Sequence, residues 1–221
     1  DGFFGSVFSN YRNNNGLSVE GGWVLASALE EAVSVSEMVS VHRHLSPSIE
    51  DIIQVTNHYS VNLFAEALLI RAKLDQSNEE AFPQSQEWIM NYWKSRLGGD
   101  APFYLVDGSG LSRSNAFSAI FLCRLLAHMQ TGELSEPFMN SLPTAGQSGT
   151  LRSLCKGTGC AGKVRAKSGT MNRVRAYAGY IQGNERDWDP FAVMINNFEG
   201  SSSSVRGRIS ALLETLIPLL N

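Results

Sequence analysis

Apolar residues recur at helical spacing along most of the first 130 residues. After Ser46-Pro47, the isoleucines at 49, 52 and 53 share one helical face, and Ser48 to Asp51 form a capping box at its start. Similar spacing, with glycine or proline at the boundaries, marks further segments. We therefore predict helices over residues 23–32, 48–59, 62–71 and 83–97, and a further helix from a cap at Ser114 or Asn115 to residue 130.

Strand-like patterns replace helical ones in the last third of the chain. Three runs separated by turn residues predict an antiparallel meander, and an amphipathic helix should close the chain. These elements are expected over residues 164–167, 174–182, 191–197 and 205–220. Shorter strands are expected at 37–45 and 103–106, and strands with turns over the Gly-, Asn- and Ser-rich residues 1–22. Helices followed by a small antiparallel sheet and a terminal helix indicate an α+β fold.

Composition narrows the classes of partner. A net charge of −3 gives no field of one sign, so we expect neither nucleic acid nor an anionic membrane as partner. The longest apolar stretches, residues 119–127 and 211–220, fall short of the roughly 20 residues of a transmembrane helix. The four histidines lack carboxylate or cysteine neighbours at zinc spacing, so no metal or other cofactor is predicted.

The three cysteines leave one question open. Cys155 and Cys160 flank a short Lys-Gly-Thr-Gly turn, so they can pair in an oxidising compartment or remain free thiols. Cys123 lies in an apolar helical pattern and is most simply a core residue.

Two short motifs can carry chemistry. In Ser60-Val61-Asn62, a loop leading into a helix can present a hydroxyl and an amide to one cleft. In Lys167-Ser168-Gly169-Thr170, a strand end offers an ammonium and hydroxyls that can bind a carboxylate and move protons. Gly169 keeps the strand edge open to a peptide, and the Thr170 amide can donate to an oxyanion.

Each motif has a structural alternative, and two other matches are rejected. Ser60 and Asn62 alone could be helix caps, and the lysine motif alone could be a strand-ending turn. Ser153-Leu-Cys-Lys156 matches the nucleophile pattern Ser-x-x-Lys, but glycines at 157 and 159 would end any helix there. Residues 157–163 match a dinucleotide fingerprint and most of a P-loop, but a strand pattern follows where a helix is needed.

A colinear series of segments makes the interpretation specific. From about residue 40 to 200 the chain resembles the low-molecular-mass class C penicillin-recognising D-Ala-D-Ala carboxypeptidases. The segments are Ser46-Pro-Ser-Ile-Glu-Asp-Ile-Ile, Asn57-His-Tyr-Ser-Val-Asn-Leu-Phe-Ala-Glu66, Asp107-Gly-Ser-Gly-Leu-Ser-Arg-Ser-Asn115, Ser141-Leu-Pro, Ser148-Gly-Thr-Leu and Gly162-Lys-Val-Arg-Ala-Lys-Ser-Gly-Thr170. The resemblance implies a DD-peptidase-like α+β fold, an exported periplasmic or extracellular enzyme acting on peptidoglycan stem peptides, and acylation by β-lactams such as penicillins.

The same resemblance implies roles and a domain plan. Ser60, Asn62 and Lys167 would be catalytic, and Ser168, Gly169 and Thr170 would bind substrate. The nucleophilic Ser-x-x-Lys is expected in an N-terminal segment of the same precursor, upstream of this chain, which we interpret as a fragment. Residues 1–40 would be the tail of an inserted accessory domain, and 41–221 the C-terminal part of the peptidase domain. Two alternatives remain open: a non-catalytic cell-wall binding or scaffold protein, and a β-lactamase.

Overall fold

The computed structural model describes residues 2–16, 45–74, 85–183 and 187–220, and divides the chain into two units, Asp1–Ser46 and Pro47–Asn221. In the first unit, helix α1 spans Gly2–Asn14, so the prediction of strands and turns there is wrong. Its aromatic residues recur at helical spacing, and Arg12 lies over the Phe8 ring, which outweighs the Gly- and Asn-rich composition. The helix predicted over 23–32 and the strand over 37–45, save its last residue, lie outside the described residues.

Helices form the first part of the second unit, largely where they were predicted. They are α2 (Ile49–Tyr59), α3 (Asn62–Leu74), α4 (Ser85–Leu97), α5 (Ala119–Met129) and α6 (Ser135–Ser141). Helix α2 begins as expected, because the Ser48 hydroxyl accepts a hydrogen bond from the Asp51 amide at 3.1 Å. The short helix α6 was not predicted, because Pro137 suggested a loop although a proline is tolerated in a first helical turn.

The start of α5 corrects the sequence prediction. Its N-cap is Ser118, whose hydroxyl accepts from the Phe121 amide, rather than Ser114 or Asn115. The intervening residues form strand β2 (Ala116–Phe117), which pairs antiparallel with β1 (Phe103–Tyr104). The Asn115 side chain instead accepts from the Val106 amide and closes the loop between β1 and β2.

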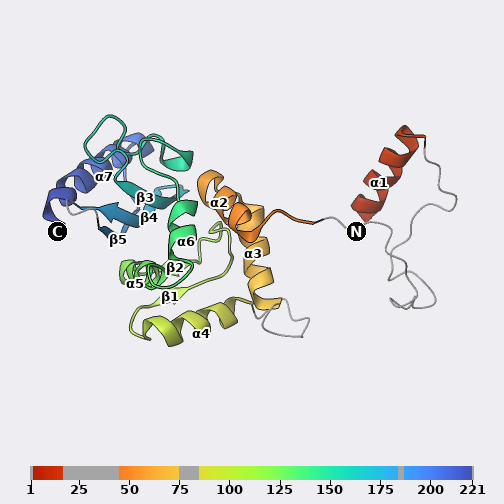
Figure 1. The fold of residues 1–221 in the computed structure, drawn as a ribbon, viewed down its shortest axis with the longest axis horizontal. Helices are drawn as coiled ribbons and strands as arrows, with labels where there is room; N and C mark the ends of the chain where they lie inside the picture. Colours follow the sequence, from red (N-terminus) through yellow and green to blue (C-terminus); the bar gives the residue numbers. More distant parts are fainter. Residues whose placement is uncertain (1, 17–44, 75–84, 184–186, 221) are drawn as a thin grey trace. The chain divides into compact units, whose positions relative to one another are not determined.

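The predicted meander is confirmed. Strands β3 (Val164–Met171), β4 (Val174–Gln182) and β5 (Trp188–Asn196) form an antiparallel sheet in the order β3-β4-β5. In this order β3 is an edge strand (Figure 1). The edge is covered at one end, where Thr144 bridges Arg165 and the Ala166 amide donates to the Pro143 carbonyl.

Helices cover both faces of this sheet. One face packs against α7 (Ser202–Leu216), which passes into the 3-10 helix η5 (Ile217–Leu219), and against the loop carrying Cys155 and Cys160. On the other face, the buried Tyr180 packs with Leu126 of α5 and Leu142, and its hydroxyl donates to the Leu126 carbonyl at 2.8 Å. Burial raises the pKa of Tyr180 to about 12.

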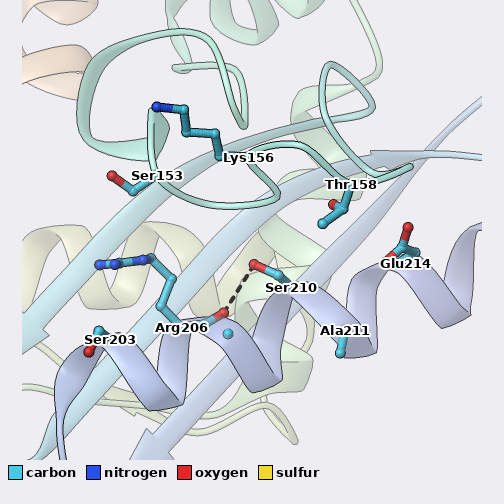
Figure 2. A pocket seen from close by; sticks show the side chains of 9 residues that line it. Ser153, Lys156, Thr158, Ser203, Arg206, Ser210, Ala211 and Glu214 are labelled. Carbon is cyan, nitrogen blue, oxygen red and sulfur yellow. Dashed lines mark hydrogen bonds between the residues drawn. The ribbon is translucent and has the colours of Figure 1, made fainter.

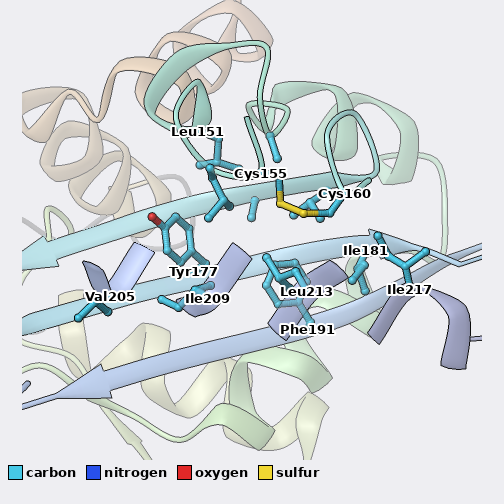
Figure 3. Close-up of a cluster of buried hydrophobic side chains, with 14 residues drawn as sticks. Leu151, Cys155, Cys160, Tyr177, Ile181, Phe191, Val205, Ile209, Leu213 and Ile217 are labelled. Atoms are coloured by element: carbon cyan, nitrogen blue, oxygen red, sulfur yellow. A yellow bond between two sulfur atoms is a disulfide. The ribbon is translucent and has the colours of Figure 1, made fainter. Parts of the chain in front are cut away.

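The cysteine question is settled in favour of pairing. Cys155 and Cys160 form a disulfide inside the main core cluster (Figure 3). Both are almost completely buried, so the bridge fixes the loop against α7 and the sheet. Cys123 is free and half-buried on α5, and its burial raises the pKa of its thiol.

Candidate active site

Ser60 and Lys167, from the two predicted motifs, meet in the structure. The Lys167 ammonium donates to the Ser60 hydroxyl with an Nζ–Oγ distance of 3.0 Å, across a sequence separation of 107 residues. Ser60 comes from the helical part of the unit and Lys167 from the sheet. Their convergence therefore requires α2 to pack correctly on the residues that precede β3.

The backbone at Ser60 presents its side chain to this contact. Ser60 ends α2 with φ 57° and ψ 51°, a left-handed conformation that costs a non-glycine residue about 1 kcal/mol. The turn lets the chain pass from α2 to α3 through only Ser60 and Val61. Non-glycine residues with such strain are concentrated at functional sites, where surrounding structure holds them.

Lys167 is positioned by the strand and by its own burial. Its side chain lies on the α5 face of β3, and the ammonium also donates to the Ser168 carbonyl at 2.8 Å. Both acceptors are neutral oxygens, so they solvate the charge without cancelling it. Burial lowers the pKa of Lys167 below its ordinary value of 10.5, which brings proton release closer to neutral pH.

Ser168 and Thr170 lie on the opposite face of the strand from Lys167. Side chains alternate along a strand, and Ala166, two residues before Ser168, belongs to the core beneath α7. Backbone groups also alternate, and the Ala166 amide points outward at the β3 edge. The amides of Ser168 and Thr170 therefore face that same edge, beyond the part covered by Pro143 and Thr144.

The 3-10 helix η4 (Gly149–Leu151) contacts both the helix that ends in the serine motif and the strand that carries the lysine motif. The Ser168 hydroxyl donates to Thr150 Oγ1 at 2.8 Å. Beside Thr150, Gly149 has φ +51°, and a Cβ there would lie 2.6 Å from the His58 carbonyl oxygen of α2. One short segment thus touches both the serine motif's helix and the lysine motif's strand, and it sets their separation.

Asn62 and Gly169 complete the predicted set. Asn62 begins α3 and is exposed, and within the described residues no hydrogen bond joins it to Ser60 or Lys167. Gly169 is half-buried, and a Cβ there would make only an ordinary contact with Ala176 at 3.5 Å. Packing therefore does not require a glycine here. The absence of a side chain instead fits a role in leaving the strand edge accessible to a peptide.

The loop after β1 fixes α3 behind Asn62. A Cβ at Gly108 would lie 2.6 Å from the Ala65 carbonyl oxygen, so the loop needs glycine to approach the helix this closely. The Ser109 amide also donates to Glu66 of α3 at 3.0 Å. These contacts explain what the Asp107–Asn115 segment, which is part of the family resemblance, does in the fold: it holds α3 in place.

Two residues that contact the lysine motif, Thr150 and Arg175, were not predicted from the sequence as site residues. Thr150 lies in the Ser148-Gly-Thr-Leu segment, which the resemblance included without assigning any function to its threonine. Arg175 is buried on β4 and donates to the Thr170 hydroxyl. An arginine between the apolar residues Val174 and Ala176 of a strand was the available signal for it.

The rejected Ser153-x-x-Lys156 match lies elsewhere. Both residues belong to turns rather than to a helix, and they line a hollow of about 340 Å³ against α7 (Figure 2). Ser60 and Lys167 do not line this hollow. Its lining residues are Ser153, Lys156, Thr158, Ser203, Arg206, Gly207, Ser210, Ala211 and Glu214.

In the part of the chain that the structure describes, no group of three or more His, Cys, Asp and Glu side chains is suited to a metal ion. None of the described helices is both long enough and apolar enough to cross a bilayer.

The arrangement supports proton transfer at a strand edge. Because Ser60 accepts from Lys167, its own hydroxyl proton is directed to another acceptor. A hydroxyl backed by an ammonium of lowered pKa can give a proton to a leaving group and recover one from the lysine. The neighbouring backbone amides can receive an extended peptide along the edge.

Comparison with known proteins places these features in one family. The D-alanyl-D-alanine carboxypeptidase of Actinomadura sp. strain R39 is 29% identical over 202 residues, which cover 89% of this chain and 37% of that protein. Penicillin-sensitive carboxypeptidase A of Dictyostelium discoideum is 29% identical over 170 residues, covering 73% and 32%. The chain therefore spans about a third of the length of these relatives.

Solved structures show the same fold. Penicillin-binding protein 4 of Haemophilus influenzae, in complex with a β-lactam, superimposes with a TM-score of 0.62 at 23% identity, covering 75% of this chain and 40% of that one. The predatory endopeptidase Bd0816 of Bdellovibrio bacteriovorus gives 0.58 at 19% identity, covering 76% and 43%. The predicted DD-peptidase-like α+β fold is thereby confirmed. Because residues 1–216 match the model of the D-Ala-D-Ala carboxypeptidase 3 (S13) family, the chain belongs to that family.

Proposed function

We propose that the protein containing this chain is a serine D-Ala-D-Ala carboxypeptidase, with endopeptidase activity, that acts on peptidoglycan stem peptides outside the cytoplasm. The observation that carries the proposal is the 3.0 Å hydrogen bond from Lys167 to Ser60. It joins the two motifs to which the family resemblance assigns catalytic and substrate-binding roles. Membership of a D-Ala-D-Ala carboxypeptidase family gives the reaction class.

The nucleophile in this proposal is the serine of a Ser-x-x-Lys motif in a segment that precedes Asp1. The relatives are about three times as long as the part matched here, which leaves room for such a segment. The Ser153-x-x-Lys156 of this chain does not take the role, because it lies in turns against α7. Residues 1–40 would then be the end of an inserted accessory domain.

The reaction proceeds by acyl transfer in two steps. The nucleophilic serine gives its hydroxyl proton to the lysine of its own Ser-x-x-Lys motif, its oxygen bonds to the carbonyl carbon of the penultimate D-Ala, and the carbon–nitrogen bond to the terminal D-Ala breaks. Ser60 gives its proton to the departing amine and regains one from Lys167, and the proton taken from the nucleophile restores the charge of Lys167. Asn62 binds the amide of the substrate, the Thr170 amide binds the oxyanion, and the hydroxyls of Ser168 and Thr170 bind the terminal carboxylate. Water then releases the acyl group.

β-Lactams are expected to acylate the same serine, because they present a reactive amide and a carboxylate in the same relation. The full-length protein should form a covalent band with fluorescent penicillin. Lys167→Ala should abolish that band, because Ser60 would lose its proton source. Lys156→Ala, which removes an exposed lysine of the hollow against α7, should leave labelling unchanged.

Other outcomes would overturn the proposal. A full-length protein that stays unlabelled, yet binds peptidoglycan, would be a wall-binding or scaffold protein. Rapid turnover of a chromogenic cephalosporin without release of D-Ala from a stem peptide would identify a β-lactamase. Undiminished labelling of Lys167→Ala would reject the site assignment itself.

A further inference from the structure

Arg175 is a buried cation directly behind the lysine motif. It is 9% exposed and lies on β4 opposite Thr170 of β3 in the strand register. Paired residues of antiparallel strands point to the same face, so both side chains lie on the α7 side of the sheet. The guanidinium is thus beneath the strand end that faces the proposed substrate.

Three hydrogen bonds fix the orientation of this guanidinium. Nε and Nη2 donate to the Tyr177 hydroxyl at 2.9 and 2.6 Å, and Nη1 donates to Thr170 Oγ1 at 2.5 Å. Tyr177 is itself buried in the main core, with its hydroxyl turned away from the disulfide (Figure 3). The planar group is therefore held at two corners and cannot swing away from Thr170.

The charge of Arg175 is solvated but not neutralised by these partners. Both acceptors are neutral hydroxyls, and the further contact is with the π face of Tyr177. Buried charges in proteins are ordinarily paired, because desolvation costs several kcal/mol. A cation kept at such a place favours the approach of an anion.

Thr170 is the point through which an anion can reach this charge. Its side chain is exposed, whereas Arg175 is covered. Because Thr170 Oγ1 accepts from the guanidinium, its own proton is turned towards an acceptor on the other side. The guanidinium also polarises that hydroxyl and makes it a stronger donor.

We infer that Arg175 is a positioning residue that gives the site its specificity for substrates ending in a free carboxylate. It acts through Thr170, which it orients and polarises as a donor to the carboxylate, while its charge offsets that of the substrate. The inference rests on the proposed function of the same site. It extends that function by naming what selects the substrate's end group.

A matched pair of substrates tests the inference in the full-length protein. One is an acyl-D-alanyl thioester whose leaving group ends in a carboxylate, and the other is the methyl ester of that carboxylate. The thioester needs little help in leaving, so the pair isolates recognition of the charge. The quantity to compare is the ratio of the two kcat/KM values.

Arg175→Met should lower kcat/KM for the carboxylate substrate roughly 10- to 100-fold, mainly through KM, and should leave the methyl ester nearly unaffected. Arg175→Lys, which keeps the charge, should show a ratio of the two kcat/KM values between those of Arg175→Met and wild type. Thr170→Val should also lower the ratio although Arg175 is retained. Arg173→Met is the matched control, because Arg173 binds the carbonyls of Asn197 and Phe198 at the adjacent turn and not Thr170.

The outcomes are distinguishable. If the wild-type protein hydrolyses neither thioester and binds no penicillin, the proposed function itself fails. If wild type is active but folded Arg175→Met and Thr170→Val keep the wild-type ratio, the inference on Arg175 is wrong. Equal loss on both substrates would likewise reject it, because that pattern indicates only structural damage. Thermal unfolding of each variant establishes that it is folded.

Discussion

The ammonium of Lys167 lies 3.0 Å from the hydroxyl of Ser60, although the two residues are 107 positions apart in the chain. The contact joins a helical layer to the edge of a sheet. Each partner is held by a different kind of constraint: Ser60 by a left-handed turn and Lys167 by strand alternation. The chemistry of the pair can therefore be tested separately from the packing that brings it together.

Ser60→Ala should slow peptide hydrolysis more than thioester hydrolysis. An amine leaves poorly without a proton, whereas a thiolate leaves readily, and a positioned proton donor is worth about 10²- to 10⁴-fold. We expect kcat for a D-Ala-D-Ala peptide to fall within that range while kcat for the thioester falls less than tenfold. Steady-state kinetics on both substrates measures this. Equal losses on both would show that Ser60 does not supply the proton.

Acylation should decline on the alkaline side at a pH below 10.5. Burial lowers the pKa of Lys167, and only its protonated form donates to Ser60. Lys167→Arg keeps a charged donor at high pH, so its alkaline limb should lie at higher pH than that of wild type. The rate of penicillin acylation between pH 7 and 11 gives both profiles. Coincident alkaline limbs would contradict the assignment.

The same shift has a consequence for stability. The native state binds the Lys167 proton less tightly than the unfolded chain does. Below the folded pKa, where both states are protonated, the buried charge therefore lowers the free energy of unfolding. That cost disappears as the pH rises past 10.5. A charged lysine at this position therefore lowers the stability of the fold at neutral pH.

Gly149→Ala should change the geometry of the Ser60–Lys167 site although Gly149 is not one of its residues. The new Cβ would lie 2.6 Å from the His58 carbonyl oxygen and 2.9 Å from the Pro143 Cβ, and η4 would have to move from α2. We expect a loss of about 2–4 kcal/mol in the free energy of unfolding, with a lower acylation rate in the folded fraction. Denaturant titration and penicillin labelling measure the two effects.

Gly157→Ala is the control for backbone strain. Gly157 also has a positive φ, +76°, but nothing lies within 4 Å of its would-be Cβ. It should lose only about 1 kcal/mol and acylate normally. If both variants lose the same amount, close packing of η4 on α2 does not hold the site.

Removal of the Cys155–Cys160 disulfide should destabilise the packing of its loop against α7 and the sheet. The bridge spans a sequence separation of 5, for which loop closure alone contributes about 2 kcal/mol. The double variant Cys155→Ala and Cys160→Ala should lose at least this much, because both side chains are also buried in the core. Urea unfolding measures the loss, and Cys123→Ala, which leaves the bridge intact, provides the comparison.

The fold could be predicted where one local pattern dominates. Helix α2 has a cap and a clear apolar face, and β4 was predicted with the bounds it has in the structure. The failures have local causes as well. In α1, aromatic spacing outweighs the glycines and asparagines, and at α5 a small sheet moved the cap to Ser118.

The site was predictable as a list of residues but not as an arrangement. Ser60 and Lys167 were found as motifs, and nothing in local pattern could show that they touch. Arg175 was missed because a charged residue in a strand ordinarily faces water. Only the register with Thr170 and the packing of Tyr177 reveal that this one is buried.

Among the described residues, nothing pairs with the β3 edge beyond the part bridged by Thr144, and this has a consequence beyond catalysis. An exposed strand edge offers unpaired N–H and C=O groups with which another extended chain can pair, including a second copy of the same protein. Whatever keeps the edge available for a stem peptide therefore also leaves the molecule open to self-association. At high concentration, substrate-like peptides or β-lactams that occupy this edge should act as solubilising agents.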